Sequence, residues 1–191
     1  MMRAVKDNAG MEQCAVRVFF AIWPDDRVQK QLSDAVNRSQ LEPLCGGRKT
    51  KTENIHLTLV FVGEVNPRKL EALCRIVDGV KGSGTRAFDL VVDRIGYWKH
   101  NNIVYAAIAK IPQELMDLVA ALQHALSTAG FSLEQRTYKP HITLMRNASC
   151  QTLPELAEPI VWRVQEWMLV KSEQTSGGSN YVPVGRWSLD S

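Results

Sequence analysis

Two short motifs of the same form hold the residues best suited to chemistry: HLTL at 56–59 and HITL at 141–144. The chain has four histidines, so half of them begin this pattern. Side chains in a β-strand alternate between its two faces. Each motif is therefore expected to present an imidazole and a threonine hydroxyl side by side, while its second and fourth residues point into an apolar core.

Two imidazoles with hydroxyl neighbours, and no cysteine or carboxylate in either motif, suit an in-line displacement at phosphorus. One histidine takes a proton from the attacking water while the other gives a proton to the departing oxygen. An imidazole with an ordinary pKa of about 6.5 can play either part near neutral pH. The hydroxyls of Thr58 and Thr143 would stabilise charge on the non-bridging oxygens. The motifs thus predict catalysis by His56 and His141 without a metal or another cofactor.

Other interpretations of the two histidines stay open. Both could be core residues that hydrogen-bond a backbone carbonyl, with the threonines favoured by strand propensity alone. A zinc or iron site would need a carboxylate partner, and neither motif has an obvious one. A serine or cysteine nucleophile is disfavoured because the chain has no GxSxG sequence and no cysteine beside either motif. The remaining histidines, His100 and His124, are expected at the surface.

Candidate phosphate-binding residues flank the second motif. Arg136 and Arg146 lie five residues before and five after His141, and either guanidinium could clamp a phosphate, although either could be a plain surface arginine. Arg146 is an odd number of residues from His141, so in a regular strand the two side chains would point to opposite faces. Arg146 shares the face of His141 only if the strand bends between them.

If the phosphate belongs to a nucleic acid, aromatic and basic residues offer further contacts to it. Tyr138 and Phe20, and less directly Trp98, could stack a terminal base, although aromatic residues in strands more often belong to the core. The basic run RKTK at 48–51 could steer an RNA backbone or simply be a solvated loop.

Hydrophobic periodicity indicates the elements that must position these residues. Strands are predicted at 17–23, 55–65, 88–97, 103–109, 141–145, 161–171 and 181–189, and helices after Pro24, after Pro67 and over 112–129. Each His-x-Thr strand follows a helix, which suggests an internal duplication. The sequence predicts an α+β fold with two lobes around a central cleft. Residues 46–49 are expected to form an exposed loop and residues 172–180 a mobile one.

Composition limits the broad class of protein. The chain has 191 residues, of which 45% are hydrophobic and 23% charged, and its net charge of +3 is too small to indicate an extended nucleic-acid-binding face. No apolar run reaches the roughly 20 residues of a membrane helix. Residues 1–15 are expected to be a flexible extension before a single domain over 16–191. Four scattered cysteines without a CxxC pair argue against a zinc site and a disulfide framework, and suggest a reducing cytoplasm.

The paired motifs resemble those of the 2H phosphoesterases, and especially of the bacterial RNA 2′,3′-cyclic phosphodiesterases, also called 2′-5′ RNA ligases. The likeness extends over RVFFAIWP at 17–24, NIHLTLVFVGEV at 54–65, KPHITLMRNAS at 139–149 and YVPVGRWSL at 181–189. It implies two lobes related by a pseudo-twofold axis, with His56 as proton donor to the leaving 3′ oxygen and His141 as the base that activates water. It also implies that Thr58 and Thr143 contact the phosphate, and that the product carries a 2′-phosphate.

We therefore expect hydrolysis of RNA 2′,3′-cyclic phosphate ends by a cytoplasmic monomer that needs no cofactor, no membrane and no obligate protein partner. Two other functions stay open. ATP-independent 2′-5′ RNA ligation is the reverse displacement, with an RNA 5′-hydroxyl in place of water. A non-enzymatic module would bind RNA ends or nucleotides without turnover.

Overall fold

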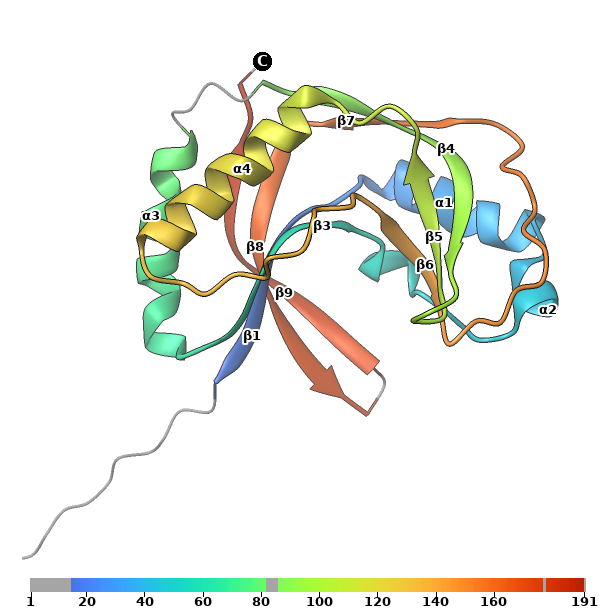
Figure 1. The fold of residues 1–191 in the computed structure, drawn as a ribbon, viewed down its shortest axis with the longest axis horizontal. Coiled ribbons are helices and arrows are strands. Elements are labelled where there is room, and N and C mark those ends of the chain that lie inside the picture. The colour runs from blue at the N-terminus through green and yellow to red at the C-terminus, as the bar shows by residue number, and fades with distance from the viewer. Residues whose placement is uncertain (1–14, 82–85, 177, 191) are drawn as a thin grey trace, which may run out of the picture.

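A curved antiparallel sheet organises the computed structural model, which describes residues 15–81, 86–176 and 178–190 (Figure 1). The strands are β1 (Val16–Ile22), β2 (Arg48–Lys49), β3 (Leu57–Val65), β4 (Phe88–Trp98), β5 (Ile103–Ile108), β6 (Ile142–Arg146), β7 (Ile160–Val164), β8 (Glu166–Thr175) and β9 (Gly178–Ser188). The helices are α1 (Asp26–Arg38), α2 (Leu41–Cys45), α3 (Leu70–Lys81) and α4 (Gln113–Thr128). The expected extension over 1–15 lies, except for Ala15, outside the described residues.

The order of the strands has a twofold pattern. The sheet runs β7-β4-β5-β6-β3-β1-β8-β9, with β2 paired separately to β6, so β3 and β6 lie in the middle. The units β1-α1-β3 and β5-α4-β6 have nearly the same spacing: their starts differ by 103 − 16 = 87, 113 − 26 = 87 and 142 − 57 = 85 residues. The predicted α+β fold is confirmed, and this spacing supports the predicted duplication.

Helices tie the two halves of the sheet together. The carboxylate of Asp25 caps α1 by accepting the Val28 N–H at 2.8 Å, and α1 packs on β6 and β7, in the other half from β1. In turn, α4 packs on β3 and lies beside α3 (Figure 1). The apolar positions predicted for α4 are buried, whereas His124 is exposed as expected. One core runs through both halves and fixes β3 against β6.

Three predicted segments differ from the structure. The strand predicted at 161–171 is two strands, β7 and β8, which meet at Gln165. The loop predicted at 172–180 belongs mostly to the β8–β9 hairpin, where the ladder continues through the pairs Ser172–Tyr181 and Glu173–Asn180. In the loop predicted at 46–49, residues Arg48–Lys49 form β2 against β6. Backbone pairing with a neighbouring strand thus outweighs the turn-forming composition of both segments.

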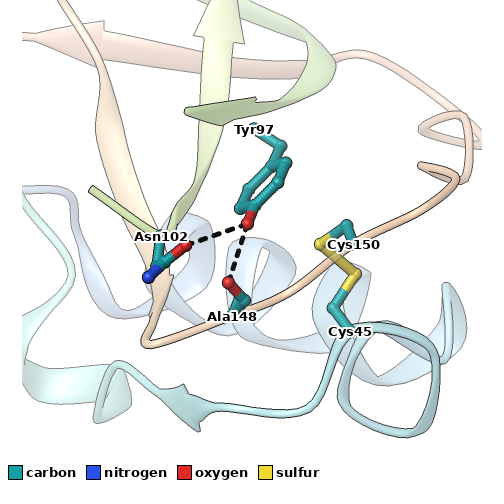
Figure 2. Close-up of a disulfide and its surroundings, with 5 residues drawn as sticks. All are labelled: Cys45, Tyr97, Asn102, Ala148 and Cys150. Atoms are coloured by element: carbon teal, nitrogen blue, oxygen red, sulfur yellow. Dashed lines mark hydrogen bonds between the residues drawn. A yellow bond between two sulfur atoms is a disulfide. The ribbon is translucent and has the colours of Figure 1, made fainter. Parts of the chain in front are cut away.

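The prediction that the cysteines form no disulfide framework is wrong for one pair, because Cys45 and Cys150 are bonded to each other (Figure 2). Their separation of 105 residues hides the pair in the sequence. In the fold, α2 ends beside the segment that follows β6, and the Ser149 N–H donates to the Cys45 carbonyl at 2.7 Å. Cys74 is a free thiol.

The same segment is anchored to the β4–β5 hairpin. The hydroxyl of Tyr97 lies 2.8 Å from the carbonyl oxygen of Ala148 and 3.1 Å from the side-chain oxygen of Asn102 (Figure 2). The Ala148 N–H donates to the Asn102 carbonyl at 3.0 Å. The end of β6 is therefore held on both sides. No helix within the described ranges is long and apolar enough to cross a membrane.

Removing the disulfide is expected to lower the free energy of unfolding by about 3–5 kcal/mol, because the bond closes a loop of roughly 100 residues in the unfolded chain. Urea denaturation of wild type and of a Cys45→Ala, Cys150→Ala variant, each with and without dithiothreitol, measures this. Cys74→Ala is the matched control and should keep the response to dithiothreitol. If the urea midpoint of the wild type were the same with and without dithiothreitol, this would contradict the presence of the disulfide.

Candidate active site

The pairing of β3 with β6 brings the two motifs together. Leu57 pairs with Ile142 in antiparallel register. Continuing this register by one residue in each direction places the histidine of each motif opposite the threonine of the other. Leu57 and Ile142 are fully buried, whereas both histidines and both threonines lie on the other, partly exposed face. The alternation predicted from the sequence is thus present on both strands.

The same backbone hydrogen bond orients both histidines. Nδ1 of His56 lies 2.7 Å from the carbonyl oxygen of Asn54, and Nδ1 of His141 lies 2.8 Å from that of Lys139. A carbonyl oxygen only accepts, so each Nδ1 carries a hydrogen and donates it. In the neutral ring, Nε2 is then the free basic nitrogen, and in the charged ring it is a second donor. Both imidazoles are therefore set to exchange a proton through Nε2.

A bulge in β6 brings Arg146 to the face of the histidines. Two consecutive residues of β5 pair with Met145 and Thr143, which leaves Leu144 as the extra residue. Leu144 and Met145 are both buried, and this shifts the alternation of faces by one position. Arg146 consequently lines the same pocket as Thr143. The bulge is the bend that the sequence requires for Arg146 to reach the site.

The pocket at His56 is basic. Its lining comprises Arg48, Lys49, Thr50, Lys51, Asn54, His56, Thr143, Arg146, Gly178, Ser179 and Tyr181. Four of these residues are lysine or arginine and none is acidic, although Lys49 is ion-paired with Glu42 at 2.7 Å. The predicted basic run at 48–51 thus lies at the site, because β2 pairs with β6. We call this the basic pocket, and its charge suits a phosphate.

Burial and neighbouring cations lower the pKa of both histidines. The pKa of His56 falls to about 4, chiefly because burial disfavours the charged ring; the Asn54 hydrogen bond opposes this, and the charges of Arg146 and His141 add to it. The pKa of His141 is lowered first by burial, and then by Arg146 and Arg136. Arg146 therefore acts on both rings, and Arg136 on His141. In the free protein the lowered pKa favours the neutral form of both rings at neutral pH.

Known proteins are similar to this chain in sequence and in architecture. The chain matches the family model described as LigT like Phosphoesterase over residues 22–105 and 108–179. This chain belongs to that family. It is 32% identical over 174 residues to the RNA 2′,3′-cyclic phosphodiesterase of Escherichia coli K12, covering 91% of this chain and 96% of the relative. It is 34% identical over 137 residues to the enzyme of that name from Thermotoga maritima, covering 69% and 70%.

Solved structures agree with the sequence match. The crystal structure of E. coli LigT complexed with 3′-AMP has a TM-score of 0.82 and 30% identity to this chain, and covers 93% of this chain and 99% of its own. A crystal structure of a phosphoesterase gives a TM-score of 0.83 over the same shares. The resemblance to the 2H phosphoesterases that the two motifs indicated is confirmed.

Aromatic rings surround both histidines of this LigT-like phosphoesterase. Trp23 stacks on His56, with ring centroids 4.5 Å apart and an angle of 13° between the planes. Tyr181 meets the same imidazole edge-on at 5.1 Å. Trp98 meets His141 edge-on at 4.5 Å. The sequence interpretation omitted Trp23 and Tyr181, because their contact with His56 depends on the neighbouring strands β1, β8 and β9.

The base-stacking prediction for Phe20 is wrong. Its side chain is 0% exposed and packs in the core, 5.7 Å from Trp167 and 6.1 Å from Trp187 between ring centroids. The preceding residue, Phe19, lies on the site face instead, 5.2 Å from His56. Alternation sends adjacent aromatics to opposite faces, and the sequence does not say which of the two faces the core.

Tyr138 is a support for the site. Its hydroxyl donates to the Thr58 carbonyl at 3.0 Å, its ring packs against the core, and burial raises its pKa. This bond ties the segment before His141 to β3, and it leaves the ring poorly placed to stack a base. Arg136 is exposed and ion-paired with Glu134 at 3.0 Å, so its predicted role at the phosphate stays a prediction.

Removing single arginines should separate their effects on the two histidines. Arg146→Met is expected to raise the pKa of both His56 and His141, because a nearby positive charge disfavours protonation of each ring. Arg136→Met should raise the pKa of His141 alone. NMR titration of the imidazole carbon-bound protons measures both values. Arg163→Met, which removes an arginine that acts on neither ring, is the control. Unchanged histidine pKa values in Arg146→Met would contradict the electrostatic account.

Gly47 allows β2 to lie against the chain that follows Arg146. Its φ is +86°, and an added Cβ would lie 2.6 Å from the Arg146 carbonyl oxygen and 2.9 Å from the Ala148 nitrogen. Gly47→Ala should therefore displace the basic residues of β2, lower the free energy of unfolding by about 1–3 kcal/mol and raise KM for a cyclic phosphate.

Gly46→Ala is the matched control for this change. Gly46 also has a positive φ of +61°, but an added Cβ meets nothing within 4 Å. The Gly46→Ala variant has similar backbone strain but no clash. Its free energy of unfolding, measured by urea denaturation, and its KM should therefore change less than those of Gly47→Ala. Equal changes of KM in the two variants would contradict a role for the packing of β2 in substrate binding.

Proposed function

We propose that this phosphoesterase hydrolyses RNA 2′,3′-cyclic phosphate ends to 2′-phosphomonoesters by acid–base catalysis. The observation that supports it best is the pair of histidines on adjacent strands, each with Nδ1 bound to a carbonyl and Nε2 free, next to a basic pocket. Relatives from Escherichia coli and Thermotoga maritima bear the name RNA 2′,3′-cyclic phosphodiesterase.

In this mechanism His141 is the base and His56 is the acid, as the family resemblance implies. Nε2 of His141 takes a proton from water as the water oxygen attacks phosphorus. The bond from phosphorus to the 3′ oxygen breaks, and Nε2–H of His56 delivers a proton to that oxygen. The products are a 2′-phosphate and a 3′-hydroxyl. Protons balance, since one imidazole gains the proton that the other loses.

The lowered pKa values are consistent with proton transfer at both rings once the substrate is bound, and the assignment of acid and base comes from the family resemblance. A cyclic phosphate carries a negative charge, and its arrival between the rings raises the pKa of each. His56, neutral in the free site, then gains the proton that it must donate. Thr58, Thr143 and Arg146 would bind the non-bridging oxygens, and Arg136 would extend this cationic field. The lack of an acidic residue in the basic pocket supports binding of an anion there.

The setting of the enzyme is part of the proposal. RNA with a cyclic phosphate end is the partner, and a monomer in the cytoplasm is its expected state. The Cys45–Cys150 bond removes the cysteine argument for a reducing compartment.

Incubation of a short RNA ending in 2′,3′-cyclic phosphate, with EDTA present, should yield the 2′-phosphate, resolved from the 3′-phosphate by chromatography. His56→Ala and His141→Ala should each lower the rate by about 10²–10⁴-fold, the usual scale for losing a general acid or base. His124→Ala, on the exposed side of α4, is the matched control and should keep the wild-type rate. Abolition by EDTA, or small losses in both active-site variants, would refute the proposal.

The pH profile should follow from the histidine pKa values. The dependence of kcat/KM reports the free enzyme, whose two histidine pKa values both lie below 6.5, so the bell should be centred below pH 6.5. As pH rises above these values, the protonated acid is lost from the free enzyme. The bell for kcat should lie at higher pH, because the bound anion raises both pKa values. A kcat/KM maximum above pH 7 would contradict this.

A further inference from the structure

A second pocket, of about 730 Å³, lies next to the basic pocket and shares Tyr181 with it. It forms where the start of α1 meets β7, β8 and β9. Its volume is within the range of small-ligand sites. The proposed proton transfers use none of its residues, so it is available for a different part of the substrate.

The charge of this pocket is opposite to that of the basic pocket. It is lined by four carboxylates and two guanidiniums: Asp25, Asp26, Glu53 and Glu166, with Arg163 and Arg186. This gives 2 − 4 = −2, against +4 in the basic pocket. Both arginines are already ion-paired, Arg186 with Glu166 at 2.7 Å and Arg163 with Asp89 at 3.4 Å. This acidic pocket would repel a phosphate and attract a neutral group rich in hydrogen-bond donors.

Gln29 gives the acidic pocket an unused amide. It lies on the inner side of α1 among Val28 and Leu32, and only 8% of it is exposed. Its side chain lines the pocket and makes no hydrogen bond to any other residue in the described part of the chain. A buried amide is costly unless it is paired. The amide atoms of Gln29 are not among the fully enclosed polar atoms without a partner in the described residues, so its donor and acceptor open into this pocket and can meet a ligand.

Trp23 gives the same pocket a flat apolar wall. One face of its indole stacks on His56, and the ring also lines the acidic pocket. Its Nε1–H donates to the Glu53 carbonyl at 3.0 Å, which fixes the plane of the ring. A base that stacks on a fixed indole typically gains binding energy whatever its sequence identity. Trp23 thus joins the reacting centre to the acidic pocket.

We propose that the acidic pocket binds the nucleobase of the nucleotide that bears the cyclic phosphate, and prefers bases with an exocyclic amino group. This inference rests on the proposed function. Trp23 stacks the base, while the Gln29 amide and the Asp26 and Glu53 carboxylates accept hydrogen bonds from amino groups, as carboxylates do from cytosine. Replacing the amino group by a carbonyl sets an acceptor against the two carboxylates, and the Gln29 amide must turn its N–H₂ group to meet it.

Two matched pairs of substrates test this preference: cytidine against uridine 2′,3′-cyclic phosphate, and adenosine against inosine 2′,3′-cyclic phosphate. Within each pair an amino group is replaced by a carbonyl. Wild type is expected to favour the amino-bearing member by about tenfold in kcat/KM. Gln29→Leu should lower both ratios, because one of the three groups that accept from the amino group is lost. Gln31→Leu, the same change at an exposed position of α1, should keep the wild-type ratios.

Wild-type ratios within twofold of one, or ratios that Gln29→Leu leaves unchanged, would overturn the proposal. Failure to hydrolyse any of the four nucleotides, and the short RNA as well, would instead refute the proposed function. Base binding in the acidic pocket is then measured without catalysis, as the affinities for cytidine and uridine 2′-monophosphates in calorimetric titrations. Tighter binding of the cytidine nucleotide, with a smaller difference in Gln29→Leu, supports the base site, and equal affinities overturn it.

Discussion

The site depends on the antiparallel pairing of β3 with β6, the two strands at the middle of the sheet. Leu57 and Ile142 face each other in this pair and are both fully buried. Side chains alternate with a period of two, so a slip of one residue would send both histidines into the core and both apolar side chains to solvent. Burying a large aliphatic side chain is worth about 1.5–3 kcal/mol, so the core itself opposes the slip. The helices that cross between the halves hold this register from outside.

Once the register is set, charge determines what each part of the cleft can bind. The bulge at Leu144 adds Arg146 to the cations of β2, and together they form a surface for a phosphate beside His56. The acidic pocket, which Trp23 also lines, has the opposite net charge. A nucleotide has a charged end and a neutral, hydrogen-bonding end, and two adjacent pockets of opposite charge would fix its direction in the cleft. In the proposed mechanism, the lowered pKa of both histidines couples the gain of the catalytic proton to arrival of the anion.

Local patterns predicted the parts of this arrangement that depend on period alone. Alternation within the motifs placed both histidines and both threonines on one face, and helical spacing located the buried side of α4. Features that depend on contacts between distant segments were missed: the Cys45–Cys150 bond, the stacking of Trp23 on His56, and the pairing of the glycine-rich segments. Phe20 was assigned to the wrong face of β1. Alternation shows that adjacent side chains point to opposite faces, but it does not show which face is buried. The sequence showed that Arg146 reaches the site only if β6 bends. The position of that bend, at Leu144, is visible only in the pairing of β6 with β5.

The most direct test of the acid–base assignment uses a 2′,3′-cyclic phosphate in which sulfur replaces the 3′ bridging oxygen. A thiolate leaves without needing a proton, so this substrate removes the requirement for a general acid and keeps the requirement for a base. Single-turnover rates of wild type, His56→Ala and His141→Ala on the oxygen and sulfur substrates would be compared. The account predicts that sulfur restores His56→Ala to near the wild-type rate and leaves His141→Ala slow. Rescue of His141→Ala instead, or of neither variant, would contradict the assignment of His56 as the acid.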